Sequence, residues 1–227
     1  MTMAWIRRLQ EWMRRRRLAR LGPKRVFARY YFKNKWGDRE SRSGKGSNLK
    51  NTEAVRRELP ALLRRHNIRS ILDLPCGDFY WMSSVDLGDI TYLGGDIVPE
   101  MIARNRKTYG QPGRQFDVID LIEGPLPKAD LVFSRDGLVH LSNEHVWAAL
   151  RNIRNSGSRF LLATHHPSDT ENADIVTGQW RPLDLTQPPF RLPPPIETIL
   201  ETYDGGPGQV KDKHMAFWRV ADIPLGT

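Results

Sequence analysis

The chain has 227 residues and a mass of 26.2 kDa, enough for one full-sized core with an appendage. Its 39% apolar and 27% charged residues are ordinary for a globular protein. The single cysteine, Cys76, excludes an internal disulfide framework and is typical of a reducing, cytoplasmic compartment. No apolar run approaches the roughly 18 residues that a membrane span needs.

The net charge of +9 resides in the first 29 residues, which contain ten Lys or Arg and one acid, Glu11. The remainder of the chain carries 25 basic and 25 acidic side chains and is neutral. A protein that binds nucleic acid through its folded body needs a basic surface there. We therefore expect no nucleic acid among its partners.

Residues 1–29 are predicted to form a basic amphipathic helical arm that ends at Gly22-Pro23. Trp5, Trp12 and Leu18 recur at helical intervals, and arginines occupy the other faces. Such a helix suits contact with an anionic membrane surface, which would place the protein at the membrane periphery. A surface helix that joins two copies of the chain in a homodimer is the alternative.

Residues 30–53 are polar and rich in Gly and Ser, yet they contain large rings such as Tyr31 and Trp36. Because such rings gain free energy on burial, this segment is predicted to fold as a lid over a site, with Ser43 within reach of a ligand. A plain linker, or a patch that packs on the core, is the alternative reading.

Residues 54–227 alternate between strand and helix patterns. After a helix over 52–67, strands are predicted over 69–74, 90–97, 114–121, 129–136 and 158–166, with a last strand over 210–223 that follows a glycine-rich turn at 204–208. A short helix is expected near residue 80, and longer helices over 98–110 and 142–155. This alternation predicts a doubly wound α/β fold, with a mostly parallel Rossmann-like sheet covered on both faces.

Ligands of such sheets bind beyond the carboxyl ends of the strands. The first strand leads into the turn at 73–78, "DLPCGD", and the second ends at Asp96, 19 positions after Gly77. A carboxylate at that place accepts hydrogen bonds from a ribose diol. The third strand ends at Asp120-Leu121, an acceptor beside an apolar side chain, which suits an adenine. Three strand ends in this order predict a nucleotide site.

The pattern "ILDLPCGDFYW…LGGDI…IDL…LVFSRD" resembles the class I S-adenosylmethionine-dependent methyltransferases over residues 50–165. The resemblance implies S-adenosylmethionine as cofactor and a seven-stranded sheet with an N-terminal lid. It assigns cofactor contacts to the strand-end residues Asp73, Pro75, Gly77, Asp78, Asp96, Ile97, Asp120 and Leu121. We also expect cofactor contacts from Trp36, Ser43, Cys76, Trp81 and Arg135.

One departure from that family lies in the first loop, where Pro75 stands in place of a glycine. Proline has no amide hydrogen and a fixed φ. Cofactor contacts are therefore expected to shift toward Cys76 and Gly77 and toward the side chains of Asp78 and Trp81.

The residues at the end of the fourth predicted strand indicate which kind of acceptor is methylated. Methyltransferases of exocyclic base amines have an Asn/Asp-Pro-Pro-aromatic motif there, whereas this chain has "SRDG" at 134–137, which disfavours nucleic-acid bases. "SRDGLVHL" is similar to phosphoethanolamine methyltransferases, in which the matching histidine acts with a tyrosine of the lid. We expect His140 to be a general base, oriented by Asp136, and either Tyr30 or Tyr31 to close over the substrate, with Tyr31 as the candidate substrate contact. A histidine that merely packs the strand–helix junction is the alternative.

The segment at about 165–195 is predicted to be a substrate loop. His165, His166 and Trp180 supply the hydrogen-bonding groups and the indole face that a sugar needs. Magnesium is conceivable here, with ligands from four neighbouring residues: His165, His166, Asp169 and Asp174. Their spacing is not that of a known metal motif, so no metal is predicted.

Together these patterns predict methyl transfer to a hydroxyl of a small molecule, with a saccharide as the best candidate. The longer pattern "PCGDFYWM…DIVP…PLPKADL…RDGLVHLS…TGQWRPL" resembles bacterial sugar O-methyltransferases, including the mycobacterial mannose-oligosaccharide enzymes. A small-amine N-methyltransferase is the alternative, disfavoured by the lack of an obvious second anion-binding cluster. A non-catalytic protein that binds S-adenosylmethionine and docks through its basic arm is the third reading.

Overall fold

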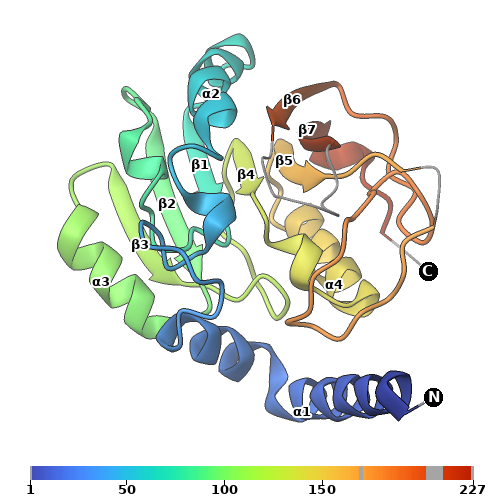
Figure 1. Ribbon diagram of the computed structural model, residues 1–227. Coiled ribbons are helices and arrows are strands. Elements are labelled where there is room, and N and C mark those ends of the chain that lie inside the picture. Colours follow the sequence, from blue (N-terminus) through green and yellow to red (C-terminus); the bar gives the residue numbers. More distant parts are fainter. Residues whose placement is uncertain (1, 169–170, 203–211, 226–227) are drawn as a thin grey trace.

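The computed structural model describes residues 2–168, 171–202 and 212–225 (Figure 1). Its described strands form one sheet in the order β3-β2-β1-β4-β5-β7-β6. Their bounds are β1 (Ser70–Asp73), β2 (Thr91–Asp96), β3 (Arg114–Val118), β4 (Leu131–Ser134), β5 (Phe160–His165), β6 (Glu197–Thr202) and β7 (Asp212–Arg219). Strand β7 pairs antiparallel with both β5 and β6, and the other pairs are parallel. The predicted seven-stranded, mostly parallel, doubly wound sheet is confirmed.

Helices cover both faces of this sheet. Their bounds are α1 (Thr2–Phe32), α2 (Glu53–Arg65), α3 (Pro99–Tyr109) and α4 (Asn143–Asn155). Successive strand residues point to opposite faces, so Leu72 and Val132 belong to the apolar cluster of α4, whereas Ile71 and Leu131 belong to that of α2. The near-continuous apolar strands of the sequence are those of a sheet buried on both sides.

Local signals explain the helix that precedes β5. Ser142 is the N-cap of α4, and its Oγ accepts a hydrogen bond from the amide of His145 at 3.3 Å. The predicted apolar stripe of Val146, Leu150 and Ile153 is fully buried. The short helix expected near residue 80 is only a 3₁₀ turn, Met82–Ser84.

The sequence predicted that the first helix ends at Gly22-Pro23, but α1 continues beyond this point. The chain kinks at Gly22, where φ is 73° and ψ is 161°, and then continues as helix to Phe32. Glycine tolerates this positive φ, and Pro23 is favourable in the first turn of a new helical segment. Tyr31 therefore lies on a helix and not in the polar lid.

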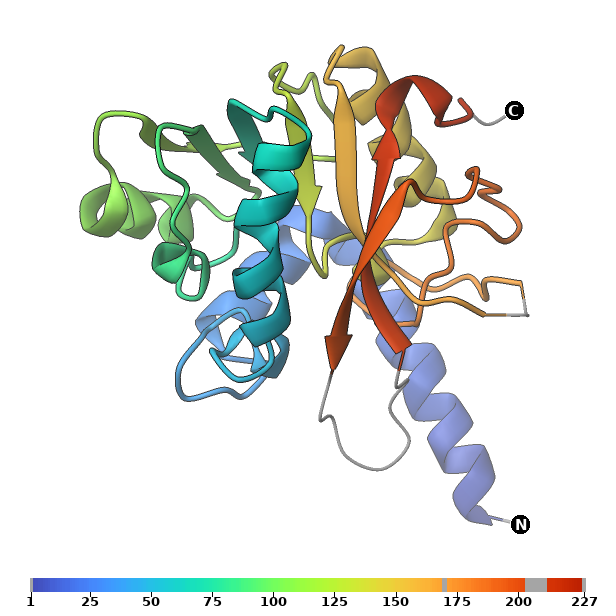
Figure 2. The same cartoon turned by 90° about the horizontal axis from the view of Figure 1, so that it is seen from above.

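The two halves of α1 have different surroundings. The first half extends beside the body to the N-terminus, and the second half runs along one end of the molecule (Figures 1 and 2). In the second half Val26 and Tyr30 are buried, and the Tyr30 hydroxyl donates to the carbonyl of Gly178 at 2.9 Å. A Cβ at residue 178 would lie 2.5 Å from Val26, so only glycine permits this approach.

The C-terminal part of the sheet was only partly anticipated. Strand β7 lies within the expected range 210–223, whereas β6 was not located from the sequence, and the turn at 204–208 lies outside the described residues. Strand β6 is an edge strand with exposed Leu200, so its pattern is weak. The predicted substrate loop is also largely structural, because Leu183, Leu185 and Phe190 are fully buried in the cluster of α4.

Candidate active site

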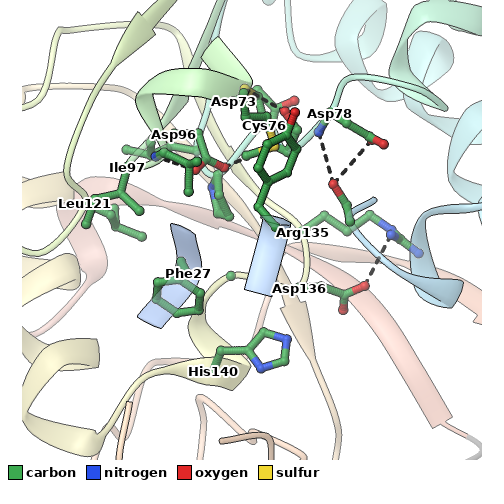
Figure 3. Close-up of a pocket in the computed structure, with 18 of the residues that line it drawn as sticks. Phe27, Asp73, Cys76, Asp78, Asp96, Ile97, Leu121, Arg135, Asp136 and His140 are labelled. Carbon is green, nitrogen blue, oxygen red and sulfur yellow. Dashed lines mark hydrogen bonds and ion pairs between the residues drawn. The ribbon is translucent and has the colours of Figure 1, made fainter. Parts of the chain in front are cut away.

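The sheet reverses its direction of winding between β1 and β4, because β2 and β3 follow on one side and β5 on the other. A cavity opens at this point, with about 1100 Å³ of empty space counting its mouth. Such a switch point is where doubly wound sheets bind their ligands. We call it the switch-point cavity. Phe27 and Tyr31 of α1 line it together with the strand ends, and Figure 3 shows Phe27 among the other labelled lining residues.

The structure brings to this cavity every residue for which the sequence predicted a cofactor contact. These are Trp36, Ser43, Asp73, Pro75, Cys76, Gly77, Asp78, Trp81, Asp96, Ile97, Asp120, Leu121 and Arg135. Asp136, His140 and Tyr31 line it as well. Their individual roles stay predictions, but their convergence follows from parallel strands that end at one edge of the sheet.

Two buried carboxyl groups face this cavity. Asp96 accepts hydrogen bonds from the amides of Val98 at 3.0 Å and Gly77 at 3.3 Å, yet burial raises its pKa to about 7. Asp73 accepts from the hydroxyl of Tyr92 at 2.5 Å, and burial raises its pKa to about 8. A ligand that donates hydrogen bonds or carries positive charge would favour the ionised form of either group.

The turn after β1 has its amides engaged within the protein. Cys76 donates to the carbonyl of Gly95 at 2.8 Å, and the Asp78 amide donates to Ser43 Oγ at 3.0 Å. With the Gly77 amide on Asp96, neither Cys76 nor Gly77 offers a free amide to a ligand. The cofactor contacts that the sequence predicts for Cys76 and Gly77 therefore have to use atoms other than the amide nitrogens of these residues.

Asp78 holds the predicted lid in place. Its carboxylate accepts hydrogen bonds from the Ser41 hydroxyl at 3.0 Å, from the Arg42 amide at 2.7 Å and from the Ser43 hydroxyl at 3.3 Å. A Cβ at Gly77 would lie 2.3 Å from Ser43 Oγ, and this residue has φ 57°, so glycine is required for this contact. These contacts hold the segment from Ser41 to Ser43 beside the cavity, and its action as a lid stays a prediction.

The wall near Ile97 and Leu121 is apolar (Figure 3). The sequence did not assign its other members, which are Phe27, Leu74, Val98, Met101, Ile119 and Ile122. Asp120 accepts hydrogen bonds through Oδ1 from the amides of Ile122 at 2.8 Å and Glu123 at 3.2 Å. Part of its acceptor capacity is thus used to stabilise the turn after β3.

His140 is oriented by a partner that the sequence did not indicate. Its Nδ1 lies 2.9 Å from the carbonyl oxygen of Gln179, and the indole of Trp36 lies beside the ring at 5.7 Å between centroids. A carbonyl oxygen only accepts, so Nδ1 carries the hydrogen and Nε2 of the neutral ring is left as the proton acceptor. Burial lowers the pKa of His140 below its ordinary value, which favours this neutral form.

Among the contacts of the described residues Asp136 makes no hydrogen bond to His140, the side chain that it was expected to orient. Its carboxylate binds Lys213 Nζ at 2.7 Å and Arg135 at 3.2 Å. Although burial opposes ionisation, these two cations hold the pKa of Asp136 well below its usual range. Among the described residues Asp136 thus influences His140 through its charge, whereas the group in hydrogen-bond contact with the ring is the Gln179 carbonyl.

Arg135 and Asp136 belong to a buried ion cluster with two residues of the last strands. Arg135 Nε binds Glu201 at 2.8 Å, and Lys213 lies 3.3 Å from the same carboxylate. The Arg135 guanidinium also lies over the Trp81 ring at 5.4 Å. No sequence signal connects Glu201 and Lys213 with this site, because they stand 65 or more positions further along the chain.

A second cavity adjoins the first. Both cavities are lined by Trp36, Ser43, Asp136 and His140, which therefore form the boundary between them. The second cavity is also lined by Gln179, His166 and Trp180, together with the basic residues Arg14, Lys35, Lys45 and Lys213. The only carboxylate among its lining residues is Asp136.

His165 is the one predicted substrate residue that lines neither cavity. Successive strand residues point to opposite faces, so His165 points away from His166. Its ring packs edge-on against Trp218, and its Nδ1 accepts a hydrogen bond from the Leu185 amide at 3.3 Å. The predicted substrate role of His165 stays a prediction, for a buried side chain that lies outside both cavities. No group of three or more His, Cys, Asp or Glu that would suit a metal occurs among the described residues, and Asp169 lies outside them.

No protein-family model and no curated protein sequence matches this chain. Solved structures do. Magnesium protoporphyrin IX methyltransferase from Synechocystis PCC 6803, with bound S-adenosylmethionine, is similar with a TM-score of 0.56 at 14% identity over 88% of this chain and 97% of that chain. N-methyltransferase NodS from Bradyrhizobium japonicum WM9, in complex with S-adenosylhomocysteine, has a TM-score of 0.59 at 13% identity over 84% and 97%.

The chain has the class I methyltransferase fold. At these identities the similarity establishes the fold alone. The features of the molecule that bear on its cofactor, reaction and acceptor are the two cavities and the residues at their boundary.

Proposed function

We propose that the protein transfers a methyl group from S-adenosylmethionine to a hydroxyl of a small polar molecule, with His140 as general base. The observation that carries this proposal is the position of His140 at the boundary of two cavities, with its single proton held at Nδ1 by Gln179. A base placed between a cofactor and an acceptor is what the reaction requires. The bound cofactor or product in the two solved structures with this fold supports the choice of cofactor.

The residues of the switch-point cavity fit S-adenosylmethionine. Asp96 is placed to accept hydrogen bonds from the ribose hydroxyls, and the apolar side chains of Ile97 and Leu121 would pack on the adenine. Asp73 and Asp96 are two buried carboxyl groups that a cationic ligand would stabilise in ionised form. When bound, S-adenosylmethionine supplies an electrophilic methyl group.

His140 contributes a proton acceptor. An alcohol has a pKa on the order of 15, so its oxygen is a weak nucleophile at neutral pH unless a base removes the proton. Nε2 takes that proton, while the bond from Nδ1 to the Gln179 carbonyl holds the ring in one tautomer. The burial that lowers the pKa of His140 keeps the ring neutral and ready at pH 7.

A saccharide is the acceptor class that we favour. The second cavity combines indole rings, Trp36 and Trp180, with the hydrogen-bonding groups of Gln179 and His166. Sugars bind through CH faces on aromatic rings and through hydroxyls on polar groups. Burial lowers the pKa of His166 to about 4, so it would bind as a neutral hydrogen-bonding group.

A second acceptor class is favoured by the charge of the same cavity. Arg14, Lys35 and Lys45 line it and form a cluster that could bind an anion. The sequence showed no such cluster, and its absence was the reason to disfavour a small-amine acceptor. Basic side chains beside a cavity favour a ligand with a phosphate or carboxylate. Phosphorylated amines and acidic sugars therefore belong in any acceptor screen.

Two measurements test the proposed function. Calorimetry should detect binding of S-adenosylmethionine and of its demethylated product, and absence of both would overturn the proposal. Transfer of a radiolabelled methyl group should then be measured to neutral sugars, acidic sugars, phosphoethanolamine and simple amines. Turnover with sugars supports O-methylation, and turnover with amines alone supports the second candidate. Cofactor binding without turnover on any acceptor would leave a non-catalytic binding protein.

A further inference from the structure

The first half of α1, residues 2–21, presents a row of large apolar side chains to solvent. The large apolar side chains that this half exposes, with their exposed fractions, are Met3 75%, Trp5 66%, Ile6 46%, Leu9 38%, Trp12 52% and Met13 49%, and all of them except Met3 form the row. Among the described residues these are six of the twelve exposed large hydrophobics, and the others are spread over the remaining chain. Such a concentration on one short segment indicates a contact surface.

Helix geometry places this row on the side that faces away from the body. At about 100° per residue, Trp5, Ile6, Leu9, Trp12 and Met13 occupy about one third of the helix circumference. The opposite side carries Leu18, which is buried, and Glu11, which accepts a hydrogen bond from Gln179 of the body. The helix is therefore attached to the protein by one side, and the apolar row lies on the other.

Basic side chains flank the apolar row and also continue its face toward Gly22, where Arg16 and Arg20 follow Trp12 at helical intervals. This half of the helix contains seven arginines, at positions 7, 8, 14–17 and 20, and one acid, Glu11, which pairs with Arg14 at 3.6 Å. Arg8, Arg15 and Arg17 are exposed and project from the two borders of the row. Arg16 lies over the Trp12 ring at 4.6 Å, which keeps a charge beside the indole. The chain beyond residue 29 is neutral, so this charge is local.

We infer that the first half of α1 lies in the surface of an anionic lipid membrane, with its tryptophans at headgroup depth and its arginines on lipid phosphates. An apolar row that contains tryptophan, bordered by arginine, is the pattern of helices that lie in this interface. The fit is to lying in the surface: none of the helices in the described part of the chain has the length and apolarity to span a bilayer. A second copy of the chain is a poorer partner, because two arms of this charge repel each other.

The experiment is co-flotation of the full-length protein with vesicles of phosphatidylcholine, with and without phosphatidylglycerol. We expect capture by the anionic vesicles alone, weakened by added salt. The double variant Trp5→Ala/Trp12→Ala should lower the partition coefficient at least about tenfold. The triple variant Arg8→Gln/Arg15→Gln/Arg17→Gln should lower it on the order of a hundredfold.

Matched substitutions outside the row control for general surface effects. Phe32→Ala removes an exposed ring of the second half of α1, and Arg104→Gln/Arg151→Gln removes two exposed charges of the body. Both controls should bind anionic vesicles as the unsubstituted protein does. Calorimetry with S-adenosylmethionine and the urea midpoint of every variant verify that the fold is retained.

Three outcomes would overturn the inference. The first is equal or absent capture by both kinds of vesicle. The second is a dimer seen by light scattering without lipid and abolished by Trp5→Ala/Trp12→Ala, which would assign the row to a second copy. The third is that duplex DNA competes fully with anionic vesicles and that loss of DNA binding follows the arginine variant but not the tryptophan variant.

Discussion

His140 shows how one hydrogen bond determines what a side chain is able to do. The carbonyl of Gln179 accepts from Nδ1 and thereby assigns the free lone pair of the neutral ring to Nε2. Asp136, which makes ionic contacts with Arg135 and Lys213, influences the ring through its charge. The chemistry of this residue is therefore set by a backbone group from a segment 39 positions later.

Replacement of His140 tests its role directly. His140→Ala should lower the rate of methyl transfer by about 10²-fold or more while affinity for S-adenosylmethionine stays close to normal. Because burial places the pKa of His140 below its ordinary 6.5, the rate should be level at neutral pH. It should fall as the pH drops through that pKa, since the imidazolium has no free lone pair. Single-turnover rates across pH measure both effects, and an unchanged rate in the variant would remove His140 from the mechanism.

Asp96 predicts a pH dependence of cofactor binding. Its pKa of about 7 means that a large fraction of the free protein carries a protonated carboxyl at neutral pH. Ribose hydroxyls donate to the ionised form, so affinity should rise with pH from about 6 to about 8, by at most about tenfold per unit below the pKa. Calorimetry should show that Asp96→Asn binds more weakly and loses this part of the slope. An identical slope in the variant would assign the effect to another group, such as Asp73.

At the scale of elements, the antiparallel pair β6–β7 completes the site from the far end of the chain. Strand β6 contributes Glu201 and strand β7 contributes Lys213, and both reach the residues that follow β4. The register of the two strands brings Glu201 opposite Lys213. The pair thus connects the last part of the sheet to the switch point through charges that are almost entirely buried.

Removal of Glu201 should be strongly destabilising. Glu201→Gln leaves the buried cations Arg135 and Lys213 with one carboxylate fewer, which costs about 3 kcal/mol in the free energy of unfolding. Glu197→Gln on the same strand is the matched control, because Glu197 pairs near the surface with the exposed Arg65 and with His66 and should contribute no more than about 1 kcal/mol. Urea unfolding compares the two, and equal losses would show that the cluster contributes little.

At the scale of the whole molecule, α1 contributes both to the cavities and to the exposed surface of the protein. Its second half lines the switch-point cavity through Phe27 and Tyr31, whereas its first half carries the exposed apolar row and contributes Arg14 to the second cavity. The kink at Gly22 separates these functions. A membrane contact made by the first half would therefore occur directly beside the proposed acceptor cavity.

Removal of residues 1–21 should separate these two contributions of α1. The shortened protein should keep its affinity for S-adenosylmethionine, because the residues of α1 that line the switch-point cavity remain. It should lose capture by anionic vesicles, and its KM for an anionic acceptor should rise because Arg14 is absent. Calorimetry and vesicle flotation test these expectations. Loss of cofactor affinity would show that the first half also positions the second.

The amino-acid sequence by itself determined the parallel part of the sheet and the residues at its strand ends. Apolar runs such as 131–134, the cap at Ser142 and the acids Asp73 and Asp96 are local signals, and parallel strands must present their carboxyl ends at one edge. This is why the predicted residues converge on one cavity although the family resemblance is distant.

Only the tertiary structure decided the rest. It determined that α1 continues through Gly22, that β6 forms the edge, that His165 is buried, and that Gln179 and Glu201 complete the site. Each of these depends on partners far apart in the chain: a carbonyl oxygen, a buried counter-charge or a neighbouring strand. The free energy of such pairings arises from burial of the pair. A local pattern of residues therefore does not predict which distant residues will pair.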